Sequence, residues 1–189
     1  MSETQAPLPR LPRPLAAALR PLPLAPLSVA LTQLAVRIAQ SHPGLFQRLG
    51  PYRAARFVLE PTDLPFCLRL DLRPGQRGGV SLTAHRRAPQ AEARIAGPLA
   101  AFLGMMHGAY DGDALFFSRD LVVEGDTSAV LALRNAIDDA ELDLSAELAG
   151  LAGPLGGLLK RAVTLAERAS GTVLHRVDAA RQGGLEGWA

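Results

Sequence analysis

The chain has 189 residues, of which 48% are hydrophobic, so it is long enough for one domain with its own core and for additional extensions. Its 20 basic and 18 acidic side chains give a formal charge of +2, which argues against a nucleic-acid-binding protein. The single cysteine, Cys67, excludes an intramolecular disulfide and a cysteine metal cage. A reducing compartment such as the cytoplasm fits this composition.

The N-terminal segment is rich in proline and arginine. Seven prolines precede residue 27 and interrupt every apolar run, so neither an export signal nor a membrane-spanning helix is predicted. We expect residues 1–26 to form an arm and the first core helix to begin at Pro26, because proline is favoured in a first helical turn. One face of this helix is apolar, with Leu27, Leu31, Leu34 and Ile38, and the other is polar, with Gln33, Arg37 and Gln40.

After Gly50 the hydrophobic period changes from helical to alternating, which is typical of β-strands. The first predicted strand places Ala55, Phe57 and Leu59 on one face. The second places Phe66, Leu68, Leu70 and Leu72 on one face and turns Cys67, Arg69, Asp71 and Arg73 away from it. We predict that these two strands form an antiparallel hairpin.

The alternation continues beyond a turn at residues 73–79. Val80, Leu82 and Ala84 predict a third strand, and residues 91–96 a fourth. Pro98 then opens a helix that carries Leu99, Phe102, Leu103 and Met106. A fifth strand is expected around residues 121–124, followed by a helix capped by Asp126 or Thr127, with Val130, Leu133 and Ile137 on one side. One sheet of about five strands with helices indicates an α+β domain.

Side chains suited to catalysis do not form a recognisable pattern. The four histidines, His42, His85, His107 and His175, lack zinc-ligand spacing, and Asp111 and Asp113 flank a glycine as in an ordinary turn. The glycines of residues 73–79 lack the Lys-Ser/Thr end of a phosphate-binding loop. Cys67 alternates with apolar neighbours, which favours a buried or half-buried thiol. We therefore predict no catalytic residues, no metal site and no cofactor.

A resemblance to a known family comes from residues 113–142, which read DALFFSRDLVVEGDTSAVLALRNAIDDAEL. This run resembles the closing strand and helix of the sterol carrier protein type-two fold. It is most similar to the bacterial branch of accessory factors in ubiquinone biosynthesis (UbiT-like). The proline-rich opening of the chain and an apolar helix after the domain also fit that branch.

The resemblance implies a sheet and helices around an apolar lipid tunnel. It assigns lipid binding to residues 27–144 and helical structure to a C-terminal extension at residues 145–189. Aromatic and Met side chains most often form only a core, so on physical grounds alone a core and a lipid-binding wall both stay open. The lining residues expected from this resemblance are Phe57, Phe66, Leu68, Leu70, Leu82, Phe102, Met105, Met106, Phe116, Phe117, Leu121 and Val123.

The implied function is that of a non-catalytic accessory protein in oxygen-independent ubiquinone synthesis. It would hold isoprenoid quinone intermediates in the cytoplasm for partner hydroxylating proteins, in reversible contact with the inner membrane. An enzyme that acts on a lipid-like substrate and a scaffold that binds proteins but no lipid are the alternatives. Lipid that copurifies without turnover would distinguish the accessory protein from both.

Overall fold

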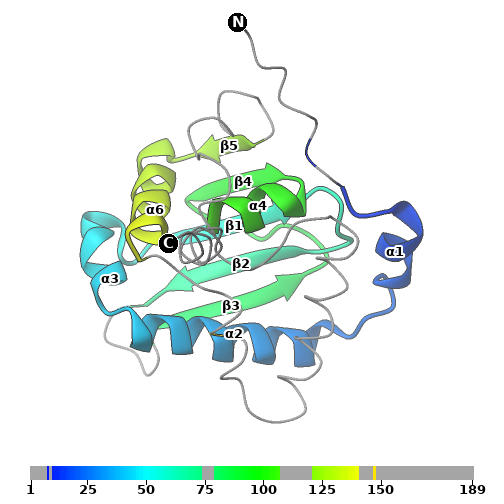
Figure 1. Ribbon diagram of the computed structural model, residues 1–189, viewed down its shortest axis with the longest axis horizontal. Coiled ribbons are helices and arrows are strands. Elements are labelled where there is room, and N and C mark those ends of the chain that lie inside the picture. The colour runs from blue at the N-terminus through cyan, green and yellow to red at the C-terminus, as the bar shows by residue number, and fades with distance from the viewer. Residues whose placement is uncertain (1–7, 9, 74–78, 107–120, 141–146, 148–189) are drawn as a thin grey trace, which may run out of the picture.

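The structure is a computed structural model that describes residues 8, 10–73, 79–106, 121–140 and 147. In this part of the chain, a five-stranded sheet lies among helices (Figure 1). The strands are β1 (Arg56–Pro61), β2 (Cys67–Leu72), β3 (Val80–His85), β4 (Ala93–Gly97) and β5 (Val122–Gly125). The helices are α1 (Arg13–Ala18), α2 (Leu24–Ser41), α3 (Gly44–Arg48), the 3₁₀ turn η1 (Gly50–Tyr52), α4 (Leu99–Met106) and α6 (Thr127–Ala140).

The strand order is β3-β2-β1-β4-β5, which confirms the predicted α+β fold with five strands. Pairing is antiparallel for β1–β2, β2–β3 and β4–β5, but β1 and β4 are parallel. The β2–β3 hairpin therefore lies on one side of β1, and the chain crosses over to place β4 on the other. Two predicted boundaries were wrong by a few residues: α2 begins at Leu24 instead of Pro26, and β4 spans Ala93–Gly97 instead of residues 91–96.

The main core lies between one face of the sheet and the helices α4 and α6. Phe57 in β1 is fully buried, and its register neighbours are Leu70 in β2 and Ala93 in β4. Around it pack buried side chains of α4 and α6, including Phe102 and Leu133. A second cluster forms where α2 packs along β3, built from Leu27, Ala30, Leu34 and Ala84.

The other face of the sheet carries charged side chains, as the alternation of β2 predicted, together with the buried Val58 and Cys67. Arg69 and Arg73 both pair with Asp71 on β2, at 2.9 and 3.4 Å, which confirms that the three share the face away from the leucines. Arg94 on β4 bridges Glu60 and Glu124 at 2.6 Å each, across β1 and β5. The pairs of Arg94 are partly exposed and contribute about 1 kcal/mol or less each. Asp71 is buried, and its two arginine partners compensate its charge.

Two hydroxyl groups of α2 form hydrogen bonds with backbone groups on the outer edge of β3. The Thr32 hydroxyl donates to the Leu82 carbonyl at 2.9 Å and accepts from the Leu82 N–H at 3.2 Å. One helical turn earlier, the Ser28 hydroxyl accepts from the Ala84 N–H at 2.9 Å. An open strand edge would present these backbone groups to another chain, so α2 protects this edge against pairing with a second molecule.

The turn from β5 into α6 depends on glycine. Gly125 has a φ of +85°, and a Cβ built there would lie 2.3 Å from the Glu92 carbonyl oxygen. That oxygen accepts a hydrogen bond from the Asp126 N–H at 3.0 Å. Asp126 then caps α6, because its Oδ1 accepts from the N–H groups of Ser128 and Ala129 at 2.9 and 3.0 Å. Of the two predicted caps, Asp126 is the one found.

Glu92 also holds the start of β1 against the start of β4. Its carboxylate accepts from the Arg56 N–H at 2.8 Å and from the Arg56 guanidinium at 2.6 Å. The hydrogen bond from Arg56 lowers the pKa of Glu92 to about 2. The carboxylate is therefore ionised at any physiological pH, and the clamp between the two parallel strands persists.

The hydrogen bonds between α2 and the outer edge of β3 lead to the first prediction. Replacing Thr32 with Val keeps the shape of the side chain but leaves the Leu82 N–H and C=O without their partner. The free energy of unfolding should fall by about 1–3 kcal/mol, and adding Ser28→Ala should lower it further. Urea denaturation measures this, with Ser128→Ala on the exposed first turn of α6 as the matched control. A Thr32→Val protein as stable as the control would show that the Thr32 hydrogen bonds do not stabilise the edge of β3.

The close approach at Gly125 leads to the second prediction. Gly125→Ala forces a Cβ against the backbone of Glu92 at a positive φ, so the free energy of unfolding should fall by about 2–4 kcal/mol. Gly44→Ala is the control, because nothing lies within 4 Å of a Cβ there. The control should stay within about 1 kcal/mol of the parent protein. Equal stability of the two variants in urea would show that the β5–α6 turn tolerates a side chain.

Candidate functional site

Half of the expected lipid-binding residues lie together in the main core. Four of them are buried and two are partly buried against the same cluster, on β1, β2, β5, α4 and the residue before β5. The buried ones are Phe57, Phe102, Met105 and Leu121, and the partly buried ones are Leu70 and Val123. The alternation of β1, β2 and β5 thus places residues from distant parts of the chain on one apolar face.

The other six expected residues are not among the described members of the main core. Phe66 and Leu68 pack against the second cluster, beside α2, and Leu82 is half-buried on β3. Met106 ends α4, but its side chain lies outside the described part of the structure, as do Phe116 and Phe117. Of the twelve expected residues, six thus belong to the main core and two, Phe66 and Leu68, to the second cluster.

Sequence reasoning missed several members of the main core. Leu49, fully buried before η1, and Ile95, 2% exposed at the centre of β4, belong to the same cluster as Phe57. The alternation of Ala93, Ile95 and Gly97 could have identified Ile95, because all three are buried while Arg94 and Ala96 are less so. Leu49 carries no periodic signal, since it lies between two short helical segments.

The cysteine and the histidines that the structure describes contact backbone or polar neighbours. Burial raises the pKa of the Cys67 thiol, and the carboxylate of Glu60 acts in the same direction. The thiol lies 3.4 Å from the His85 carbonyl, to which it can donate, and the His85 ring lies 2.8 Å from the Thr83 hydroxyl. His42 lies 3.6 Å from Glu147. In the described ranges, no three His, Cys, Asp or Glu residues lie close enough to hold a metal ion.

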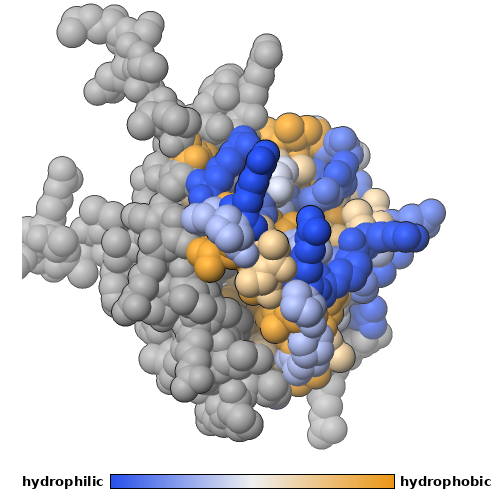
Figure 2. Space-filling view, turned by 90° about the vertical axis from the view of Figure 1, so that its right-hand side faces the viewer, coloured by the Kyte–Doolittle hydropathy of each residue, from blue (hydrophilic) through white to orange (hydrophobic). Residues whose placement is uncertain are grey.

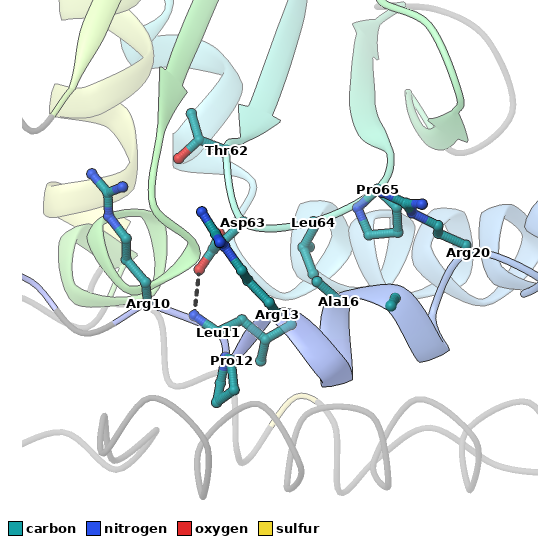
Figure 3. Close-up of a pocket in the computed structure, with 11 residues that line it drawn as sticks. Arg10, Leu11, Pro12, Arg13, Ala16, Arg20, Thr62, Asp63, Leu64 and Pro65 are labelled. Carbon is teal, nitrogen blue, oxygen red and sulfur yellow. Dashed lines mark hydrogen bonds between the residues drawn. The ribbon is translucent and has the colours of Figure 1, made fainter.

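A groove of about 860 Å³ lies at the end of the sheet where the N-terminal segment crosses the β1–β2 connection (Figure 3). Three arginines line it, Arg10, Arg13 and Arg20, together with apolar side chains of the segment and of the connection, such as Leu11 and Leu64. Asp63 accepts a hydrogen bond from the Leu11 N–H at 2.9 Å, drawn as the dashed line in Figure 3. The segment expected to be an arm is thus attached to the domain from Arg10 onward.

A comparison with protein families identifies the fold. The family model described as the SCP-2 sterol transfer family matches residues 32–138, which is more than half of the chain. The chain belongs to the SCP-2 sterol transfer family. The match begins within α2 and ends within α6, so the sheet and the main core lie inside the SCP-2 region.

Solved structures agree with this assignment. A protein named UbiJ-SCP2 ubiquinone synthesis protein aligns with a TM-score of 0.52 at 19% identity, over 64% of this chain and 96% of that chain. A sterol carrier protein 2 aligns with a TM-score of 0.44 at 15% identity, over 59% of this chain and 96% of that one. The apo form of sterol carrier protein 2 from Yarrowia lipolytica gives 0.41 at 15%, over 57% and 88%. At these identities the first likeness shows a shared SCP-2 fold.

No curated protein matches the chain significantly. Among the helices that the structure describes, none has the length and hydrophobicity needed to cross a membrane.

The buried Cys67 thiol leads to the third prediction. Because its pKa is raised, the thiolate fraction at pH 8 should be low, and iodoacetamide should react at least about tenfold more slowly with the folded protein than with the urea-unfolded chain. Cys67 is the only cysteine, so total thiol loss reports this one site. Equal rates would mean an accessible thiolate and would reopen the question of a nucleophile.

Proposed function

We propose that the protein is a lipid-binding accessory factor in ubiquinone synthesis, and that its lipid-binding residues are those of the main core facing α4 and α6. The observation that carries the proposal is the continuous apolar face that β2, β1, β4 and β5 present within the SCP-2 region. The shared fold with a ubiquinone synthesis protein, along nearly the whole length of that chain, supports the choice of pathway.

The composition of this face suits a flexible apolar ligand. Phe57 and Phe102 provide large aromatic surfaces, and Met105 provides an adaptable thioether side chain. Burial contributes about 0.8 kcal/mol per CH₂, so the roughly ten carbons of two prenyl units would contribute about 8 kcal/mol. This gain exceeds the cost of association only if that cost lies in the lower half of its range of about 4–15 kcal/mol. A site of the usual size of about 300–1,000 Å³ is too small for a whole polyprenyl tail. We therefore propose that the ligand is an isoprenoid quinone intermediate whose tail is engaged in part.

The finer assignments rest on the resemblance to accessory factors of ubiquinone synthesis. The protein holds the quinone intermediate, and the hydroxylation chemistry belongs to separate partner proteins in an oxygen-independent route. Residues 27–144 carry the lipid site, and residues 145–189 are available for partners or for packing on the domain. Contact with the inner membrane is reversible, because the ligand resides in the bilayer while the carrier acts in the cytoplasm.

The direct test is mass spectrometry of lipids extracted from the purified full-length chain, together with an assay for turnover of any quinone found. Isoprenoid quinones or their precursors, recovered unchanged after incubation, would support a carrier. Turnover by the pure protein would instead identify an enzyme, and protein free of lipid in every preparation would favour a scaffold.

Adjacent valines on β5 provide the fourth prediction. Val123 is partly buried against the main core, whereas Val122, on the opposite face, is 52% exposed. Val123→Asp places an unpaired charge at an apolar surface, which should reduce copurifying lipid by most of its amount, whereas Val122→Asp should leave it unchanged. Lipid content per mole of protein is measured by mass spectrometry.

The milder Val123→Thr variant separates loss of binding from loss of folding. It is nearly isosteric and should fold, yet its hydroxyl still disfavours an apolar ligand, so lipid content should fall to an intermediate value. If folded Val123→Asp and Val123→Thr proteins carry as much lipid as Val122→Asp, this face of the sheet does not bind the lipid.

A further inference from the structure

The N-terminal segment is attached to the SCP-2 domain by defined hydrogen bonds. Leu11 is buried, and its N–H donates to Asp63 Oδ2 at 2.9 Å. The other oxygen of the same carboxylate, Oδ1, accepts from the N–H of Leu99, the first residue of α4, at 2.8 Å. Both oxygens of Asp63 therefore have backbone donors, and the segment is fixed beside the β1–β2 connection.

A second attachment lies at the far end of the segment. The Arg86 guanidinium donates to the Leu22 carbonyl at 2.7 Å and to the Pro65 carbonyl at 3.3 Å. Arg86 thus joins the residues before α2 to the β1–β2 connection. The groove between the segment and this connection has fixed walls at both ends, which reduces the entropy lost when a ligand binds.

The groove carries positive charge that the described protein does not neutralise. Arg10, Arg13 and Arg20 are exposed, and within the described residues none of the three forms a salt bridge. Asp63, the one carboxylate among the lining residues that the structure describes, already accepts from two N–H groups. Figure 2, which looks onto the end of the molecule where α1 lies, shows strongly hydrophilic side chains next to hydrophobic ones.

We propose that this arginine groove binds the phosphate-bearing headgroups of an anionic lipid bilayer. Guanidinium groups bind phosphate oxygens in bidentate pairs, so the three arginines supply the recognition. The apolar side chains between them, including Leu11, Leu64 and Pro65, provide surface for the glycerol and upper acyl carbons. This site is separate from the main core, and the proposal does not depend on which lipid the core carries.

The lining favours a bilayer over the other sources of phosphate. A free phosphate ion would gain nothing from apolar side chains in the lining. It would also require converging donors, whereas the three guanidinium groups are spread along a groove of about 860 Å³. A nucleic acid would be expected to stack its bases on aromatic side chains, and there is no aromatic residue among the described residues that line the groove. A bilayer surface with many charged headgroups matches both the spacing of the three arginines and the apolar side chains between them.

The test compares two arginine pairs in the full-length chain. Arg13→Gln/Arg20→Gln removes two charges from the groove. Arg48→Gln/Arg53→Gln removes two exposed charges near α3, at the opposite end of the sheet (Figure 1). Binding is measured by sedimentation with vesicles of phosphatidylcholine, with and without phosphatidylglycerol. Each arginine near an anionic surface should contribute about fivefold in affinity, so the groove pair should weaken binding at least about tenfold.

The expected result is binding that requires phosphatidylglycerol, is lost in the groove pair, is retained in the control pair and weakens with salt. Arg13→Lys/Arg20→Lys should keep much of the binding, because it preserves the charge, and this shows that the Gln pair does not act through misfolding. Lipid copurifying with the core should stay unchanged in the groove pair, which separates this site from the proposed carrier function.

Three outcomes would overturn the proposal. Equal loss in the groove pair and the control pair would indicate unspecific attraction by net charge. Release from the vesicles by millimolar inorganic phosphate at constant ionic strength would assign the groove to the free ion. Tighter binding of the groove to single-stranded RNA than to the vesicles, lost in the same pair, would assign it to nucleic acid.

Discussion

The hydrogen bonds from Ser28 and Thr32 to the outer edge of β3 are the contacts on which the rest of the arrangement depends. They fix α2 along β3, where its leucines form the second cluster with Ala84. With α2 held at this edge, one face of the sheet stays available for α4 and α6, and the residues before α2 are directed past the β1–β2 connection. Both the main core and the arginine groove follow from that placement.

The parallel pairing of β1 and β4 is the second constraint. It brings Phe57 level with Ala93 and Leu59 level with Ile95, so that residues almost forty positions apart form one apolar surface. A parallel pair requires a long connection, and here the β2–β3 hairpin is contained within it. The glycine turn after β5 then returns the chain across the end of β4, which places α6 over this surface.

Local patterns predicted the elements because each depends on near neighbours. The alternation of β2 assigned Leu70 and Asp71 to opposite faces, and the Asp126 cap could be inferred from its position before an apolar helix. Strand order and parallel pairing could not be inferred, since alternation does not identify a strand's partner. The contact between Leu11 and Asp63 spans 52 positions and involves a backbone N–H, so no side-chain pattern signals it. For the same reason the N-terminal segment was expected to be an arm.

The shared carboxylate of Asp63 links two parts of the molecule mechanically. Because one side chain accepts from both Leu11 and Leu99, displacing the N-terminal segment alters the restraint on the first turn of α4, which covers the main core. The N-terminal segment at the surface and the helix over the apolar interior are therefore anchored on one partly buried carboxylate, so that Asp63 is at once part of the surface and of the support of the core.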